Sequence, residues 1–239
     1  MATHAEDLKF RLATVEMLRT AKKHFTYREL SGKTDLPVTV LSRYVKGHVL
    51  PNTSRAHTLW VALSKIVGLE AEFRRRIKFD STGFFDNTQI IGDISLLDQA
   101  ANYALANFAG RRITKVLTAA VDGVPLATMV ANALDVNIVI AKPNKEVGVP
   151  SFLEETYTLD VSGHMMTLYL PRDVIKKKDS VLIVDDVIKS GETQLALLKL
   201  VEKAKAEVSG VFAMIGVGNS WKQKMNIPKS CQVEIILEI

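Results

Sequence analysis

The chain has 239 residues, of which 47% are hydrophobic and 24% are charged, and it contains one cysteine, Cys231. This balance is that of a globular protein and argues against wholesale disorder, while a single cysteine excludes an internal disulfide. No apolar run approaches the roughly 18 residues that a membrane span requires. Residues 1–10 show no secretory signal, so we expect a cytoplasmic protein without membrane contact.

The net charge of +5 is unevenly divided along the chain. Residues 1–78 hold 15 Lys and Arg against 7 Asp and Glu, a balance of +8, whereas residues 79–239 hold 16 against 19, a balance of −3. Such asymmetry favours an anion-binding module joined to a second, mildly acidic domain. A solvated basic face without a partner is the alternative.

The first 78 residues carry a helical pattern. Leu8, Leu12, Val15 and Leu18 follow the three-four spacing of an amphipathic helix. Further helices are expected at 26–34, 37–46, 54–67 and 70–78. The stretch 79–89 is rich in turn formers and weak in periodicity, so we place the domain boundary there.

In the second half of the chain, strands alternate with helices. The sequence predicts strands at 113–121, 136–142, 176–186, 209–218 and 233–239. It predicts helices at 96–110, 125–134 and 191–206. The pattern of residues 143–155 is that of a loop, and a pair of strands is expected at 157–161 and 166–170. This alternation predicts a parallel sheet covered by helices, so the expected fold class is α/β, with an all-helical domain at 1–78, a linker at 79–93 and a sheet domain at 94–239.

In the basic half, two predicted short helices flank a tight turn near Asp35. Leu30 and Leu41 are expected in the core between them, Asp35 tolerates a left-handed backbone, and Pro37 suits the first turn of the second helix. The spacing across residues 26–51 resembles the helix-turn-helix of the Cro and phage-repressor family. The matching positions are Leu30-Ser31, Leu41-Ser42-Arg43, Gly47 and Pro51.

This resemblance implies that the second helix enters the major groove of double-stranded DNA. It implies that Val38, Thr39, Ser42 and Arg43 face base edges, where Arg pairs with guanine and Thr and Val suit the thymine methyl group. Lys46 would contact a phosphate, which orients the protein without specifying sequence. An ordinary helical hairpin used for protein contacts is the alternative.

The acidic half contains its most specific segment at residues 181–193, VLIVDDVIKSGET. An apolar run leads into the adjacent carboxylates Asp185 and Asp186, and a short turn then opens a helix. Ligands of parallel sheets bind at the carboxyl ends of the strands, and a loop that opens a helix offers N–H groups to a phosphate. The carboxylates suit sugar hydroxyls or Mg²⁺, so the segment predicts a sugar-phosphate site; two acids that merely cap a helix are the alternative. We assign to this site Asp185, Asp186, Lys189, Ser190, Gly191, Glu192 and Thr193.

The same segment resembles the phosphoribosyl-diphosphate motif of type I phosphoribosyltransferases. The resemblance implies a type I phosphoribosyltransferase-like sheet domain in which the two acids bind ribose and residues 189–193 bind the 5′-phosphate. A second match lies at residues 119–125, where the family binds pyrophosphate, and it implies roles for Asp122 and Gly123.

The resemblance also gives a role to the segment after the second strand of this domain. Lys142 stands where the family often has a basic residue that meets the pyrophosphate, and residues 143–157 would form a mobile loop over the site. Mg²⁺ would arrive with phosphoribosyl diphosphate, and no other cofactor is expected. No His or Cys spacing suggests a protein-held metal, and we assign no catalytic residue.

Lys189 helps to separate two functions. Several purine transferases place an acid or a small residue at this first loop position, whereas a charged lysine cannot accept a proton from a base. The pattern Asp-Asp-x-x-Lys-x-Gly-x-Thr resembles the loop of bacterial purine-operon repressors, and the two-domain order resembles an archaeal family of helix-turn-helix regulators with a transferase-like domain. We therefore favour a transcription regulator that senses phosphoribosyl diphosphate or a related ribose phosphate or nucleotide. An active purine or orotate phosphoribosyltransferase with a DNA-binding extension is the alternative.

The resemblance further implies a homodimer, because transferase folds of this type usually dimerise. A dimer would pair two DNA-binding heads, and two recognition helices about 34 Å apart would read a palindrome across one helical turn.

Overall fold

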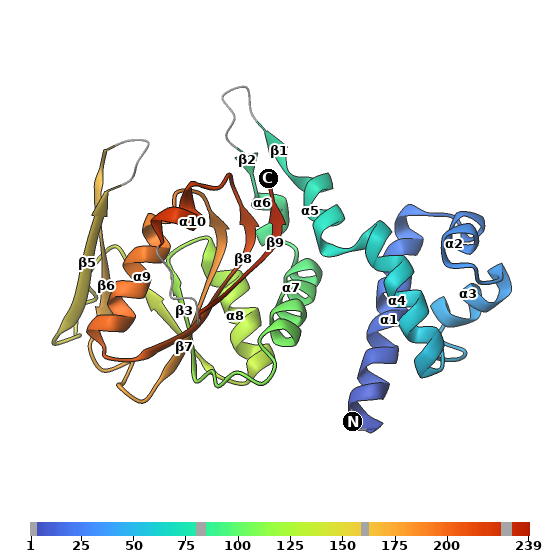
Figure 1. Cartoon of the computed structure of the whole chain (residues 1–239), viewed down its shortest axis with the longest axis horizontal. Coiled ribbons are helices and arrows are strands. Elements are labelled where there is room, and N and C mark those ends of the chain that lie inside the picture. Colours follow the sequence, from blue (N-terminus) through green and yellow to red (C-terminus); the bar gives the residue numbers. More distant parts are fainter. Residues whose placement is uncertain (1–3, 80–84, 159–162, 226–230) are drawn as a thin grey trace. The chain divides into compact units, whose positions relative to one another are not determined.

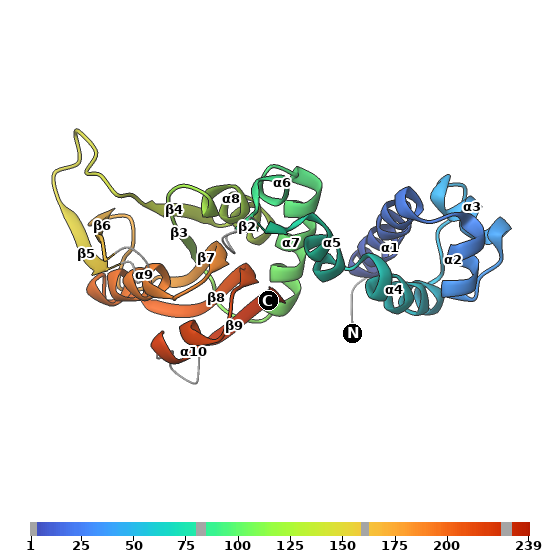
Figure 2. The ribbon, with the colours of Figure 1, turned by 90° about the horizontal axis from the view of Figure 1, so that it is seen from above.

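A computed structural model describes residues 4–79, 85–158, 163–225 and 231–239, and the chain divides into two compact units, residues 1–75 and 76–239 (Figures 1 and 2). Helix α5 (Leu69–Arg76) ends at the first residue of the second unit. The stretch 79–93, expected as a linker, therefore lies in the second unit, although residues 80–84 are outside the described residues.

The first unit is helical, as the sequence predicts. Its helices are α1 (His4–His24), α2 (Tyr27–Thr34), α3 (Val38–Val45), α4 (Thr53–Val67) and most of α5. Leu30 and Leu41 are fully buried in one cluster with Val15 and Leu18 of α1. Leu8 and Leu12 share the apolar spacing but are 38% and 47% exposed, so the buried stripe of α1 covers only its later turns.

The connection between α2 and α3 is set by local residues. Thr26 begins α2 with a capping box, in which its hydroxyl accepts from the Glu29 N–H and its own N–H donates to the Glu29 carboxylate. Asp35 ends α2 in the left-handed region, with φ 55° and ψ 29°. The Ser31 hydroxyl donates to the Leu36 carbonyl at 2.7 Å and so closes the turn from inside.

The second unit is built on a five-stranded parallel sheet with the order β4-β3-β7-β8-β9. These strands are β3 (Lys115–Ala119), β4 (Asn137–Ala141), β7 (Ser180–Ile188), β8 (Glu207–Gly216) and β9 (Gln232–Glu238). Helices α7 (Ile94–Asn107) and α8 (Gly123–Leu134) lie on one face, and α9 (Glu192–Lys203) lies on the other (Figure 1). The parallel sheet covered by helices is thus confirmed.

Several elements differ from the predictions. An antiparallel ribbon, β5 (Phe152–Thr158) with β6 (Met165–Pro171), begins inside the stretch expected to be a loop. The ribbon is held to α9 because Lys199 and Lys203 bind Glu155 at 3.0 and 2.7 Å, contacts that no local pattern reveals. Of the expected strand 157–161, residues 159–161 lie outside the described residues.

Short elements were also missed. They are β1 (Lys78–Phe79), β2 (Phe85–Asp86), α6 (Thr88–Ile91) and α10 (Ser220–Lys224). Each spans two to five residues, which is too short to show a periodicity. Two of them, α6 and α10, lie next to the site described below.

Candidate functional site

The two adjacent acids lie in the second half of β7, because the strand continues to Ile188, two residues beyond its predicted end. Asp185 and Asp186 are each 7% exposed. Consecutive strand residues point to opposite faces of a sheet, and the hydrogen bonds follow that rule. Asp185 accepts from the Gln194 amide of α9 at 2.5 Å, while Asp186 accepts from the side-chain amide of Asn87, the residue before α6.

Burial decides the electrostatics of this pair. Burial raises the pKa of Asp185 well above its usual range, and the neighbouring charge of Asp186 raises it further. Burial also raises the pKa of Asp186, and the negative charge of Asp122 adds to the effect. A group that brings positive charge or hydroxyl donors to this pair would therefore relieve an existing electrostatic cost.

The loop after β3 approaches the acids closely. A Cβ added to Gly123 would lie 2.6 Å from Oδ1 of Asp185 and 2.6 Å from the Thr118 hydroxyl oxygen, so only glycine fits there. Val121 is 75% exposed, Asp122 is also exposed, and α8 begins at Gly123. The structure thus brings the two motifs found in the sequence to the same end of the sheet.

The loop after β7 opens α9 through Gly191, whose φ is +84°. A Cβ on Gly191 would lie 2.9 Å from Met225 Cγ and 3.2 Å from Trp221 Cβ, so α10 packs directly on this glycine. Glu192 is 6% exposed and its carboxylate pairs with Lys224. Lys224 therefore pairs with one oxygen of this buried carboxylate, while the other, Oε2, has no hydrogen-bond partner within the described part of the chain.

The other loop residues differ in exposure. Lys189 is exposed and its carbonyl accepts from the Ser220 hydroxyl at 3.5 Å, while Ser190 is half-buried. The Thr193 hydroxyl donates to the hydroxyl of Tyr157 at 3.4 Å, so the β5–β6 ribbon contacts the first turn of α9. A loop that opens a helix and carries hydroxyls and an ammonium has groups that can bind a phosphate.

Lys142 directly follows β4. Its backbone pairs with Tyr169 of β6 by two hydrogen bonds of 3.0 and 2.8 Å, and its ammonium pairs with Glu146. The Lys142 side chain is 42% exposed. Among the described residues, its ammonium makes no hydrogen bond to Asp185 or Asp186. Lys142 therefore lies where the ribbon leaves the sheet, with its charge balanced by Glu146.

Sequence reasoning missed Asn87 and Gln194. Gln194 occupies a helix position among buried residues and is itself only 2% exposed, which is unusual for an amide. An amide side chain within two positions of the Gly-x-Thr turn was the available signal for Gln194. No sequence signal connects Asn87 to Asp186, because 99 positions separate them.

The first unit carries the second candidate site, on α3. Val38 is 42% exposed, Thr39, Arg43 and Lys46 are exposed, and Ser42 is half-buried. The five side chains expected to meet DNA therefore do not belong to the buried core of this unit. The structure places them on and directly after one short helix, α3.

No helix in the described part of the chain is long and apolar enough to cross a membrane. Within the same residues, no three His, Cys, Asp or Glu side chains gather as a metal site.

Comparison with known proteins matches residues 86–238 to the phosphoribosyl transferase domain model. The chain is 31% identical over 133 residues to the purine biosynthesis transcriptional repressor of Bacillus subtilis, covering 56% of this chain and 47% of the repressor. It is 36% identical over 128 residues to the xanthine phosphoribosyltransferase of Clostridium acetobutylicum, covering 52% of this chain and 66% of the enzyme. The match thus spans about half the length of the repressor and about two thirds of the enzyme.

Among solved structures, the adenine phosphoribosyltransferase of Rhodothermus marinus aligns with a TM-score of 0.61 at 29% identity, over 72% of this chain and 98% of that one. The adenine phosphoribosyltransferase of Thermoanaerobacter pseudethanolicus aligns with a TM-score of 0.63 at 20% identity, over 72% and 99%. The C-terminal region therefore has the parallel-sheet fold of type I phosphoribosyltransferases.

Proposed function

The chain belongs to the phosphoribosyl transferase domain family, and from this premise we propose that it is a DNA-binding transcription regulator. Its second unit binds phosphoribosyl diphosphate, or a related ribose phosphate or nucleotide, as an effector. The observation that carries this proposal is the meeting of three features at one end of the sheet: the buried acid pair, the Gly123 loop and the loop that opens α9.

Each part of the ligand has a matching group. Asp185 and Asp186 accept from the ribose hydroxyls, and the N–H groups and hydroxyls of residues 189–193 bind the 5′-phosphate. The loop through Asp122 and Gly123 binds the pyrophosphate, together with Lys142, which follows β4. This last role requires Lys142 to exchange Glu146 for the ligand.

Mg²⁺ fits this site as a companion of the ligand. Asp185 and Asp186 provide hard oxygen ligands, and a bound cation would lower their raised pKa values. Mg²⁺ is commonly held by one or two carboxylates together with phosphate oxygens, which agrees with a buried acid pair beside the loops proposed for the phosphates. Asp185 and Asp186 would hold the ion, and its charge would offset part of the negative charge of the ligand.

In the first unit, α2 and α3 form a helix-turn-helix in which α3 enters the major groove of DNA. The left-handed Asp35, the buried Leu30 and Leu41 and the exposed polar face of α3 support this assignment. The +8 charge of residues 1–78 supports it independently, because phosphate attraction supplies most of non-specific DNA affinity. We further propose that the protein acts as a homodimer and resembles archaeal regulators of this two-domain order.

The similarity to purine repressors and the lysine at the first loop position favour a regulator. The ammonium of Lys189 is exposed at the end of β7 and cannot act as a general base while charged. The 36% identity to a xanthine phosphoribosyltransferase favours the second candidate, an active purine or orotate phosphoribosyltransferase with a DNA-binding extension.

The test is calorimetric titration of the full chain with phosphoribosyl diphosphate and Mg²⁺, followed by transferase assays with each nucleobase. We expect saturable binding without turnover. The Asp185→Asn, Asp186→Asn double variant should lose this binding, whereas Asp173→Asn, which changes an exposed acid, should keep it. Turnover with any base would establish the second candidate, and absence of binding would reject the ribose-phosphate site.

A further inference from the structure

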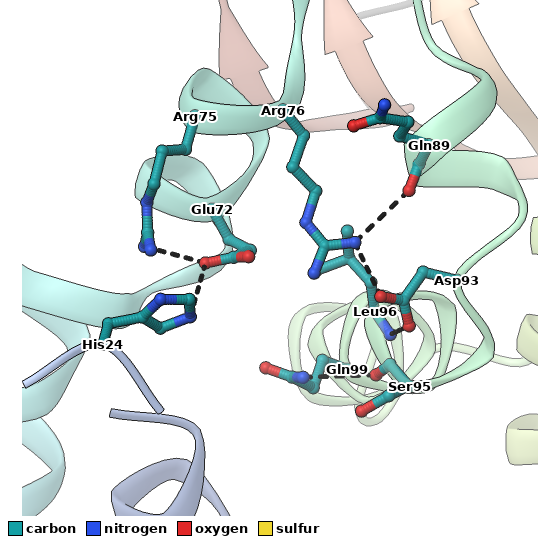
Figure 3. A network of polar contacts seen from close by, with 9 residues as sticks. All are labelled: His24, Glu72, Arg75, Arg76, Gln89, Asp93, Ser95, Leu96 and Gln99. Atoms are coloured by element: carbon teal, nitrogen blue, oxygen red, sulfur yellow. Dashed lines mark hydrogen bonds and ion pairs between the residues drawn. The ribbon is translucent and has the colours of Figure 1, made fainter. Parts of the chain in front are cut away.

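The first residue of the second unit is tied to the junction of α6 and α7. Arg76 ends α5, and its guanidinium donates to the Asp93 carboxylate at 2.6 Å and to the Gln89 carbonyl at 3.3 Å (Figure 3). Asp93 in turn accepts from the Leu96 N–H and so caps α7. The Arg76 hydrogen bond lowers the pKa of Asp93, so the ion pair persists at neutral pH.

The opposite end of α6 is tied to the ligand site. Asn87 directly precedes α6 and donates its side-chain amide to Oδ2 of Asp186. Its carbonyl accepts from the N–H groups of Ile90 and Ile91 at 2.8 and 3.0 Å, so the same residue begins the helix. Ile90 is fully buried, which anchors this single turn in the core.

One helical turn therefore separates Asp186 from Arg76. Asn87 contacts the acid that we assign to ribose, and the carbonyl of Gln89, two residues later, contacts the arginine that ends α5. These two hydrogen bonds and the backbone of α6 between them form a continuous path from Asp186 to Arg76 within the second unit. Such a path can transmit a change only if a ligand favours one arrangement of it over another.

The Asn87 contact supplies that difference. Asp186 is only 7% exposed, and one of its oxygens is already used by the Asn87 amide. A ribose hydroxyl or a Mg²⁺ ion that takes this oxygen competes with the amide for the same lone pairs. Binding then frees Asn87 and loosens the start of α6.

We propose that Asn87 is a positioning residue that converts occupancy of Asp186 into a change at α6 and Arg76, and through α5 into a change in the DNA-binding unit. This inference rests on the proposed function, because it assigns the route by which the effector regulates DNA binding. It assigns no contact between the two units beyond the continuity of α5.

Hydrogen exchange of the full chain tests this route without DNA. On addition of phosphoribosyl diphosphate and Mg²⁺, we expect exchange to slow at residues 189–193 and to accelerate about tenfold at Ile90, Ile91 and Gly92, the loss expected for about one hydrogen bond. In Asn87→Ala the α6 amides should exchange quickly without ligand and should not respond to it. The matched control is Asn102→Ala, which removes an exposed amide of α7. Among the described residues this amide bonds only to Asp98, so the variant should behave as the unchanged protein does.

A second pair of variants tests the far end of the route. Arg76→Gln should keep the exchange response of α6 but lose the effect of ligand on DNA affinity, and Arg76→Lys should restore part of it by keeping the charge facing Asp93. Calorimetry separates the two claims. Ligand binding with unchanged or slowed exchange at residues 90–92 overturns this inference and leaves the proposed function standing, whereas absence of ligand binding rejects both.

Discussion

The side-chain amide of Gln194 donates a 2.5 Å hydrogen bond to Oδ2 of Asp185, and both side chains are buried. Burial and the charge of Asp186 raise the pKa of Asp185, and the Gln194 bond opposes that rise. The amide of Gln194, which belongs to α9, therefore favours the ionised form of Asp185. Ligand affinity and local stability should both depend on this bond.

Gln194→Leu should destabilise the protein by about 1–3 kcal/mol, because it leaves a buried acceptor without its donor. The pKa of Asp185 should rise further, so that affinity for phosphoribosyl diphosphate falls at pH 7. Urea unfolding and calorimetry measure the two effects. Gln99→Leu, which changes a half-buried glutamine of α7 whose amide bonds to the Ser95 carbonyl, is the control and should alter neither; wild-type affinity in Gln194→Leu would contradict this role.

Stability should depend on pH through the acid pair. The pKa values of both acids are raised in the folded state, so their contribution to stability is fully present below the unfolded value of about 4 and is lost as pH rises through the folded values. Asp185→Asn should therefore increase the free energy of unfolding at pH 8, because it removes the charge that burial disfavours; each unit by which the folded pKa exceeds the unfolded value corresponds to ~1.4 kcal/mol. The gain should shrink toward pH 4 in urea titrations; a variant less stable than wild type at pH 8 would speak against the raised pKa.

Gly123→Ala should displace Asp185 and weaken ligand binding, because its Cβ would lie 2.6 Å from a carboxylate oxygen and from the Thr118 hydroxyl oxygen. Overpacking of this kind costs about 1–3 kcal/mol of stability. Gly32→Ala is the matched control: no atom lies within 4 Å of its Cβ, and alanine favours the helix interior by roughly 0.5–1 kcal/mol. Equal effects of the two substitutions in thermal unfolding would refute the close approach at Gly123.

The sequence could predict the parts of this fold that rest on long patterns. The apolar runs of β3, β4, β7 and β8 are strands, and the Asp-Asp and Gly-x-Thr segments lie at one end of the sheet. What it could not predict depends on contacts between distant residues. Asn87 meets Asp186 across 99 positions, and the start of β5, in the stretch expected to be a loop, pairs with β6 and contacts two lysines of α9 through Glu155.

The same distinction explains Leu8, Leu12 and Glu192. Spacing alone places Leu8 and Leu12 on the stripe that buries Val15 and Leu18, yet among the described side chains of α1 the apolar core residues lie in its later turns. Glu192 shares the loop sequence with Gly191 and Thr193, but α10 binds its carboxylate through Lys224. The motif predicted that this segment opens a helix, which α9 confirms, and it did not decide which group each side chain contacts.

Arg43→Ala should reduce affinity for a preferred DNA sequence by about 1–3 kcal/mol, because a guanidinium that pairs with a guanine edge contributes about that much to discrimination. Affinity for phosphoribosyl diphosphate should not change. Arg74→Ala, which changes an exposed arginine of α5 paired with Glu70, is the control for lost charge. Loss of ligand binding in Arg43→Ala would reject separable units, and an affinity for DNA that does not fall with salt would reject the basic face.

The most direct measurement is the affinity of the full chain for a duplex selected from a random pool, with and without phosphoribosyl diphosphate and Mg²⁺. We expect the ligand to change this affinity by about fivefold or more, which is the usual scale of coupling between two sites. The Asp185→Asn, Asp186→Asn variant should bind the same duplex without responding to the ligand. An unchanged DNA affinity at saturating ligand, together with release of pyrophosphate when a nucleobase is added, would contradict the regulator and identify an enzyme.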